Sequence, residues 1–200
     1  MPKRSTKMAS VVYLLFGFHL IVIMSSSLPA TSEVFAKQYP STEPVEEKLT
    51  QLHFYFHNNI TGEHPTAMKT VLPPKGSIHG FGATYMMDDP LTEGPSPTSK
   101  LVGRSQGIYA LASQHEPGLL MVTNFLFTLG IYNGSTLSIL GRNPTFIKVR
   151  EMPIVGGTGI FKYARGSAVL TTYVYDITGG VAIVEYNVTV MHLFLKTLYL

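Results

Sequence analysis

Short apolar runs separated by glycine, proline and asparagine fill the chain from Leu49 onward. Within residues 51–57, Leu52, Phe54 and Phe56 alternate with histidine and tyrosine, which is the two-residue period of a half-buried strand. The runs that follow are also rich in β-branched and aromatic residues and are bounded by turn-forming residues. We therefore predict strands at 51–57, 81–87, 102–112, 119–129, 135–140, 144–152, 161–175 and 181–195.

Turn signals support antiparallel pairing between these runs. Asn133-Gly134 is the strongest short hairpin dipeptide, and Gly179-Gly180 ends a turn segment between two long runs. No stretch shows a sustained apolar stripe of 3.6-residue period with helix caps. The pattern predicts an all-β fold, a barrel or a sandwich, and favours a closed barrel because closure leaves no edge strands.

Alternation also orients the last run. Glu185, Asn187 and Thr189 share one face, and the apolar residues between them share the other. Asn187 is therefore expected to face outward. It begins one of three Asn-x-Ser/Thr sequons, which are expected glycosylation sites if the chain is secreted, at Asn59, Asn133 and Asn187.

Residues 1–30 have the pattern of a secretory signal peptide. Basic residues precede an apolar run at 11–24, and small or turn-forming residues at 25–30 suit cleavage. An uncleaved membrane anchor is the alternative, but a spanning helix needs about 20 apolar residues and this run is shorter. Residues 31–48 are polar and predict a flexible leader, and residues 49–200 are expected to form one domain.

The charge of the chain depends on that signal segment. The chain has 15 basic and 12 acidic residues, a formal net charge of +3. Lys3, Arg4 and Lys7 account for the whole excess, so the chain after cleavage is expected to be neutral. The basic character therefore gives no support to a nucleic-acid partner.

The chain has no cysteine. This absence excludes a thiol nucleophile, a disulfide and a cysteine-ligated zinc site. His53 and His57 fall on one side of a predicted strand, but no third ligand has metal-binding spacing relative to them, so we predict no metal site.

Two glycine-containing motifs resemble catalytic or phosphate-binding motifs, but neither is followed by the helix that such motifs need. Gly103-Arg104-Ser105-Gln106-Gly107 matches the nucleophile elbow of hydrolases, but the residues that follow continue a strand where the elbow needs a helix. Gly156-Gly157-Thr158-Gly159 is not followed by a helix that could bind phosphate, and is interpreted as a tight turn between strands.

Asp88-Asp89 is the strongest candidate for acid–base chemistry. Two adjacent carboxylates at the end of a β run could raise the pKa of one of them and make it a general acid. The alternative is an Asp-capped turn, helped by Pro90. Because neighbouring side chains on a strand point to opposite faces, only one of the two can point into a barrel.

A set of colinear motifs, which together cover roughly residues 50–193, resembles the plant dirigent family. Motifs of the first half of the domain are Tyr55-Phe56-His57, Phe81-Gly82, Asp88-Asp89-Pro90-Leu91-Thr92, Leu101 to Gly107 and Asn124-Phe125-Leu126-Phe127. Motifs of the second half are Tyr132 to Leu137, Gly141-Arg142-Asn143-Pro144, Val149 to Pro153, Val155 to Gly159, Phe161 to Gly166 and Glu185 to Val188. The Gly-Arg-Asn-Pro form and the absence of cysteine resemble the broad dirigent-like subgroup.

The resemblance implies an eight-stranded antiparallel barrel, an oligomer (dimer or trimer) and secretion to the plant apoplast. It implies a protein without a cofactor that guides the coupling of phenoxy radicals, which a separate oxidase, a laccase or a peroxidase, supplies. The products would be optically active lignans made from monolignols such as coniferyl alcohol. On this reading the protein orients the radicals and is not itself an enzyme, which agrees with the absence of a recognisable redox site.

The resemblance also carries site residues onto this sequence. Lignan-forming members have Asp where this chain has Asn58 and Asn143, whereas an Arg seven positions beyond the latter is retained as Arg150. An Asn cannot protonate a quinone methide as a carboxylic acid can. The predicted catalytic residues are Arg150, Asp88 and Asp89, and the predicted substrate-binding residues are Phe56, Asn58, Tyr109 and Asn143.

Two other functions stay open at this point. A cofactor-free lyase that acts through a quinone methide, such as a pterocarpan-forming isoflavanol dehydratase, is suggested by the loss of the two acids at Asn58 and Asn143. A non-catalytic wall or defence protein that binds phenolics is the third possibility.

Overall fold

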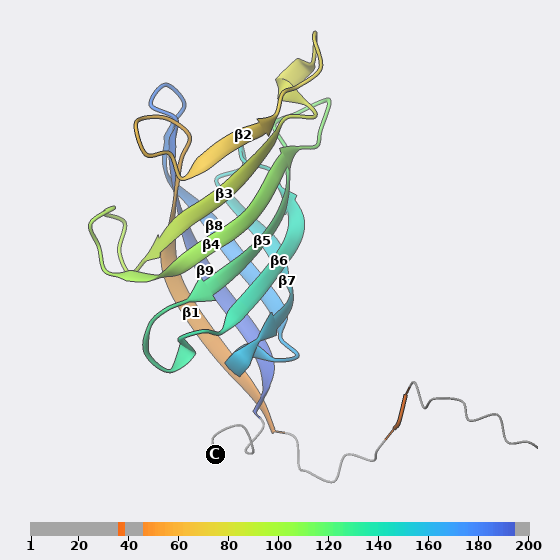
Figure 1. Ribbon diagram of the computed structural model, residues 1–200, viewed down its shortest axis with the longest axis vertical. Helices are drawn as coiled ribbons and strands as arrows, with labels where there is room; N and C mark the ends of the chain where they lie inside the picture. The colour runs from red at the N-terminus through yellow and green to blue at the C-terminus, as the bar shows by residue number, and fades with distance from the viewer. Residues whose placement is uncertain (1–35, 39–45, 195–200) are drawn as a thin grey trace, which may run out of the picture. The chain divides into compact units, whose positions relative to one another are not determined.

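The computed structural model of the chain describes residues 36–38 and 46–194 (Figure 1). The chain divides into two units, Met1–Glu43 and Pro44–Leu200. In the first unit only residues 36–38 are described, and they form no helix or strand. The predicted signal peptide therefore lies outside the described residues, as does most of the predicted leader. No helix of the described part is both long and apolar enough to cross a membrane.

The second unit is a closed antiparallel barrel. Its strands are β1 (Glu46–Asn59), β2 (Ala67–Val71), β3 (Thr84–Thr92), β4 (Leu101–Leu111), β5 (Leu119–Phe127), β6 (Thr136–Asn143), β7 (Val149–Thr158), β8 (Arg165–Asp176) and β9 (Val181–Phe194). Short 3₁₀ turns are η1 (Ile78–Gly80), η2 (Gly130–Tyr132) and η3 (Gly159–Phe161).

Strand β1 closes the barrel because it pairs on both sides. It pairs with β9 along its whole length, from Glu46 opposite Phe194 to Asn59 opposite Val181. Its other edge meets β3 only at Tyr55 opposite Thr92 and Phe56 opposite Leu91. The sheet order from β9 through β8, β7, β6, β5 and β4 to β3 completes an eight-stranded barrel, as predicted, and β2 is added outside it by pairing with β3.

One end of the barrel is filled by aromatic side chains. Phe54 lies edge-on to Phe125 with ring centroids 5.1 Å apart and stacks on Tyr186 at 5.5 Å. Phe161 packs against Phe127, with ring centroids 5.6 Å apart, and Phe127 in turn packs against Phe54 at 6.1 Å. All five rings are buried, so this end is solid core. The open space of the barrel lies toward the other end of these strands.

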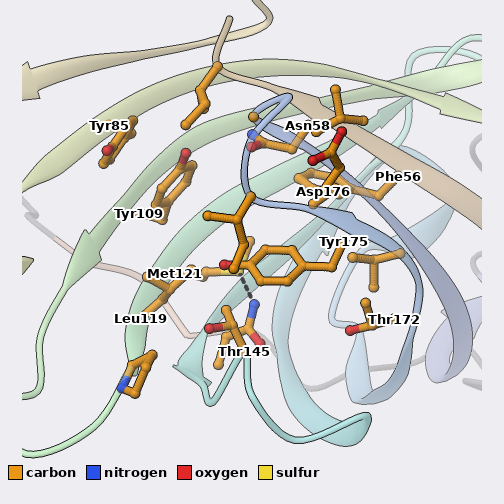
Figure 2. Close-up of a pocket in the computed structure, with 18 of the residues that line it drawn as sticks. Phe56, Asn58, Tyr85, Tyr109, Leu119, Met121, Thr145, Thr172, Tyr175 and Asp176 are labelled. Atoms are coloured by element: carbon orange, nitrogen blue, oxygen red, sulfur yellow. Dashed lines mark hydrogen bonds between the residues drawn. The ribbon is translucent and has the colours of Figure 1, made fainter. Parts of the chain in front are cut away.

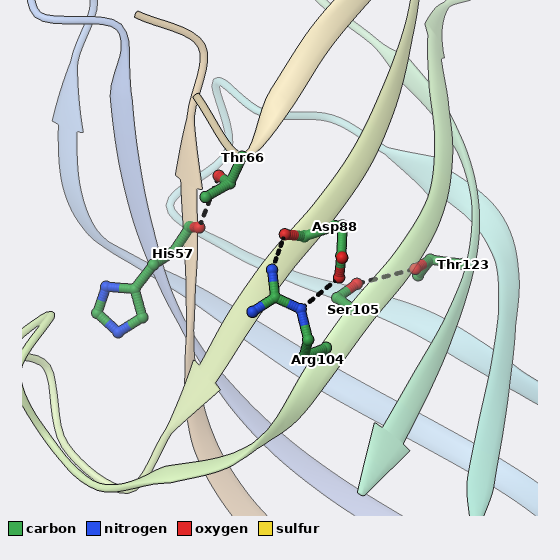
Figure 3. A network of polar contacts seen from close by, with 6 residues as sticks. All are labelled: His57, Thr66, Asp88, Arg104, Ser105 and Thr123. Carbon is green, nitrogen blue, oxygen red and sulfur yellow. Dashed lines mark hydrogen bonds and ion pairs between the residues drawn. The ribbon is translucent and has the colours of Figure 1, made fainter. Parts of the chain in front are cut away.

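Alternation orients the strands as expected. In β9 the side chains of Val184, Tyr186 and Val188 are buried inside the barrel, and Asn187 is exposed on its outer face. The Gly-x-Ser-x-Gly motif lies within strand β4, where the Ser105 hydroxyl is buried and 2.8 Å from the Thr123 hydroxyl (Figure 3). Strand therefore continues on both sides of this serine, as the sequence predicted.

The structure corrects several predicted boundaries. Strand β1 already begins at Glu46, so the leader prediction was wrong for 46–48, and the predicted strand at 144–152 begins only at Val149. Strand β2 was missed, because only Ala67 of its five residues is buried and the rest are exposed, which leaves no alternation to detect.

The interpretation of the glycine-rich segment 156–159 as a tight turn was wrong for most of its residues, which lie in strand β7. Gly156 and Gly157 belong to β7, and only Gly159 has a positive φ, +62°. A Cβ on Gly157 would lie 2.6 Å from the carbonyl oxygens of Phe161 and Thr136. This glycine therefore permits close backbone approach within the sheet.

Gly107 in β4 has a similar role next to the barrel interior. A Cβ there would meet the Val122 carbonyl oxygen and would lie 2.6 Å from the Thr123 Cα. Gly107→Ala is expected to lower the free energy of unfolding by about 1–3 kcal/mol, because β4 and β5 must separate to admit the methyl group. Urea denaturation followed by circular dichroism measures the change.

Gly156→Ala is the matched control, since it is also a strand glycine and a Cβ there meets nothing within 4 Å. Equal stability of the two variants would contradict the packing of β4 against β5.

Candidate active site

A cavity of about 260 Å³ occupies the end of the barrel opposite the aromatic core (Figure 2). Its wall is largely apolar and includes the rings of Phe56, Tyr85, Tyr109, Tyr175 and Tyr186. Polar groups are few, and they gather at two places on this wall. Figure 2 shows Asn58 and Asp176 toward one end of the cavity and Thr145 and Thr172 toward the other.

The structure brings together most of the residues that the sequence singled out. Phe56, Asn58, Tyr109, Asn143 and Arg150 all line the cavity. They come from β1, β4, β6 and β7, and each occupies an inward position of its strand. The predicted substrate-binding set is thus contiguous in space, although its role in binding stays a prediction.

The first polar group joins Asn58 on the cavity wall to Asp89 behind it, which is not itself one of the residues that line the cavity. The Asp89 side chain is fully buried, and its Oδ2 accepts a hydrogen bond of 2.9 Å from Asn58 Nδ2. Its Oδ1 has no hydrogen-bond partner. Burial raises the pKa of Asp89 to about 7, and the hydrogen bond from Asn58 only partly opposes that shift. This carboxyl group can therefore hold a proton close to neutral pH.

Tyr109 connects Asp89 to the aromatic wall. Its ring stacks on Tyr85 with centroids 4.7 Å apart, and Asn58 lies close enough to its phenol to lower the phenol pKa. Burial raises the pKa of the Tyr109 phenol, so it remains a neutral hydrogen-bonding group. Tyr109, Asn58 and Asp89 form one cluster, the acid cluster.

The second polar group centres on Arg150. Its Nε donates to Asn143 Oδ1 at 2.6 Å and its Nη1 donates to Thr172 Oγ1 at 2.7 Å. Asn143 in turn donates from Nδ2 to the Met121 sulfur at 2.9 Å. Burial lowers the pKa of Arg150, while the neighbouring Tyr186 opposes that shift. Arg150, Asn143 and Thr172 form the arginine cluster.

Asp88 does not belong to the cavity, and its prediction as a catalytic residue does not fit the structure. Strand alternation places it on the outer face of β3, where its Oδ1 accepts a hydrogen bond of 2.5 Å from Arg104 Nε (Figure 3). About half of its side chain is exposed. Of the two adjacent carboxylates, Asp89 is the one that faces inward.

Sequence reasoning missed several wall residues. Tyr186 was correctly placed on the inner face by alternation but was not connected with a site. Thr172 could not be placed in this way, since a register shift between Thr172 and Val174 interrupts the alternation of β8. Met121 and Tyr85 carry no signal beyond their place in a strand.

The remaining predictions concern the outer surface. Asn133 and Asn187 are exposed, and Asn59 Oδ1 accepts a hydrogen bond of 3.1 Å from the Thr61 amide. Their glycosylation stays a prediction.

The two histidines considered as metal ligands have other partners. His53 pairs with Glu185 at 2.8 Å, whereas His57 is buried against the Thr92 hydroxyl at 2.7 Å. In the described part of the chain, no three His, Asp or Glu residues come together as a metal site would require.

Comparison with known proteins identifies the fold family. The sequence profile of the family described as "Dirigent-like protein" matches residues 49–191. The chain belongs to the dirigent family. Dirigent protein 21 of Arabidopsis thaliana is 45% identical over 191 residues, which make up 92% of this chain and 100% of that protein.

Two further relatives carry a more specific name. Pterocarpan synthase 1 of Glycyrrhiza echinata is 51% identical over 170 residues, which make up 80% of this dirigent chain and 90% of that protein. A solved structure of a pterocarpan synthase dirigent protein matches with a TM-score of 0.70 at 51% identity. The match covers 75% of this chain and 88% of that one.

The raised pKa of Asp89 makes the stability of the barrel depend on pH. Because the folded pKa of about 7 exceeds the ordinary aspartate value of 3.8, the folded state holds this proton more tightly than the unfolded chain. Its contribution to stability is therefore full below about pH 4 and is lost as the pH rises to about 7. Relative to Asp89→Asn, the wild type is expected to lose ~2–4 kcal/mol of unfolding free energy between pH 4.5 and 8.

Urea denaturation of both proteins at the two pH values checks this expectation. Asp89→Asn keeps an oxygen that can accept from Asn58 but carries no titrating proton. Parallel stability profiles for the two proteins would show that Asp89 is ionised in the folded barrel at neutral pH.

Proposed function

We propose that this dirigent chain is a cofactor-free lyase that removes water from a phenolic alcohol through a quinone methide, as in the closure of a pterocarpan ring. The observation that carries the proposal is the pairing of an acid cluster with a separate arginine cluster across one aromatic cavity. Pterocarpan synthases, whose sequences are about 50% identical to this chain, support it.

The chemistry needs two polar groups at a distance from each other. The substrate phenol loses its proton, the bond between the benzylic carbon and its hydroxyl breaks, and that hydroxyl leaves with a proton as water. A second phenolic hydroxyl then bonds to the same carbon and releases its proton, while the quinone methide oxygen takes one up. The net change is loss of one water molecule, and no oxidant is required.

The two clusters fit these two ends of the substrate. Arg150 offers a cationic donor where negative charge develops on the phenol oxygen. Asn58 and Tyr109 offer hydrogen bonds to the leaving hydroxyl, and Asp89 is the group of that cluster whose pKa, about 7, suits proton supply. The aromatic wall between them orients the rings.

The size of the cavity favours a reaction of one substrate molecule. Its volume of about 260 Å³ lies just below the ~300–1,000 Å³ that is usual for small-molecule sites. A single phenolic with three or four fused or linked rings is in proportion to such a space. Two monolignol radicals held side by side need a larger one.

Stereoselective coupling of phenoxy radicals remains the second candidate. The stacked Tyr85 and Tyr109 rings favour it, because they form a flat surface on which a planar radical can lie with one face covered. In that case the radicals come from a separate laccase or peroxidase, and the barrel adds orientation only. For either function we propose secretion to the apoplast as an oligomer.

Incubation with 2′-hydroxyisoflavan-4-ols in the absence of oxidant tests the first candidate. We expect a pterocarpan with one predominant enantiomer, measured by chiral chromatography.

Tyr109→Phe is expected to lower kcat/KM about 10- to 100-fold, because one hydrogen bond to the reacting groups is lost. Tyr132→Phe, whose ring stacks on Phe161 and lies outside the cavity, is the matched control and should keep full activity.

Absence of product from every such isoflavanol would reject the lyase. The second candidate is tested by adding coniferyl alcohol with a laccase. If the chain is a lyase, the coupled lignans should be racemic. A reproducible enantiomeric excess without isoflavanol turnover would instead establish the coupling role.

A further inference from the structure

The arginine cluster contains a buried positive charge that has no carboxylate beside it. Arg150 is only 7% exposed, yet its hydrogen bonds go to an amide oxygen, a hydroxyl and the carbonyl oxygens of Ile147 and Lys148. None of the ion pairs found among the described residues includes it. A buried cation without a counter-charge is costly, and an anion that arrives next to it recovers part of that cost.

Asn143 is the residue that keeps this charge uncompensated. It lies 2.6 Å from Arg150 Nε, where a carboxylate would form a close ion pair. Its orientation is fixed, because the Met121 sulfur accepts from Nδ2 and leaves the amide oxygen to face Arg150. An aspartate in the same place would direct a carboxylate oxygen at that sulfur. The site is therefore built around a neutral amide.

Other titratable groups of the cavity do not neutralise Arg150. Burial raises the pKa of Tyr186, whose phenol interacts electrostatically with Arg150, so that phenol stays uncharged. Asp89 belongs to the acid cluster, where its carboxyl group is hydrogen-bonded to Asn58 and not to Arg150. Its pKa of about 7 keeps it mostly protonated only below neutral pH. Asp176 lines the cavity at the β8–β9 turn, where its Oδ1 accepts from the Gly179 amide at 2.9 Å, and Figure 2 shows it at the end away from Thr172.

From this arrangement we infer that the arginine cluster is a phenolate subsite, and that Asn143 determines the charge state in which the ligand binds. The cavity takes up the phenol of its ligand as the anion, with the charged oxygen against Arg150. This inference deepens the proposed function, because a phenolate is the form that expels the benzylic hydroxyl. It concerns equilibrium binding alone, so it can fail or hold independently of turnover.

The test is the pKa of a bound phenol that changes its absorption spectrum on ionisation, for which 7-hydroxycoumarin is a suitable probe. With protein in excess, absorbance titration of the full domain should show the phenol pKa lowered by about one unit or more relative to free probe. Asn143→Asp supplies the missing counter-charge, so the pKa of the bound probe should return to the free value or rise above it.

Arg150→Met and Arg150→Lys together distinguish an effect of the positive charge on the probe pKa from an effect of a disturbed fold. The first removes the cation and should abolish the shift, whereas the second keeps the cation and should retain most of it. 7-Methoxycoumarin, which has no acidic proton, should bind the wild type and Asn143→Asp equally well, which shows that the cavity itself is unchanged.

Failure of 7-hydroxycoumarin to bind, or an unshifted pKa in the wild type, would overturn the inference. Equal shifts in the wild type and Asn143→Asp would overturn the role of Asn143. A lowered pKa combined with no isoflavanol turnover would reject the proposed lyase while leaving the phenolate subsite in place.

Discussion

The inward face of β1 holds the barrel and its site together. This strand pairs with β9 along its whole length and with β3 at two positions, so the barrel closes through it. Its alternate residues Phe54, Phe56 and Asn58 pass in turn from the solid aromatic core to the cavity wall and then to the acid cluster. Because successive inward positions are fixed by the pleat, a one-residue slip would remove all three from the interior.

The barrel separates two environments along its axis. The filled end excludes water and stabilises the fold through packed rings, while the other end leaves space and places a few polar groups on an apolar wall. In that setting the energy of a charge depends strongly on its immediate partners. Burial raises the pKa of Asp89 to about 7, so it can hold a proton close to neutral pH, and Arg150 remains a cation without a carboxylate partner. The acid–base character of the cavity follows from burial more than from the number of charged residues.

The fold could be predicted from the sequence because the pattern behind it is local. The alternation of Leu52, Phe54 and Phe56, and the turn residues Asn133 and Gly134, are visible in the sequence and are where the structure places them. Strand β2 could not be found, because an added outer strand buries too little to show a period. The start of β1 at Glu46 was missed because none of its first five residues is buried, so they show no apolar alternation.

The site was predictable only in part. Family resemblance pointed to Asn58, Asn143 and Arg150, but the sequence could not tell which of Asp88 and Asp89 faces inward, and the register of β3 decides that. The contact of Asn143 with Met121, and the place of Thr172 beyond a bulge in β8, depend on three-dimensional packing between strands far apart in the chain. No linear pattern encodes such contacts.

A crystal structure of the domain with a bound pterocarpan or a stable isoflavan analogue tests the central claim most directly. We expect one ligand molecule in the cavity. Its phenol oxygen should lie within hydrogen-bond distance of Arg150, and its benzylic carbon should face Tyr109 and Asn58. A ligand outside the barrel, or one whose phenol lies against Asp89 with only ring carbons near Arg150, would contradict it.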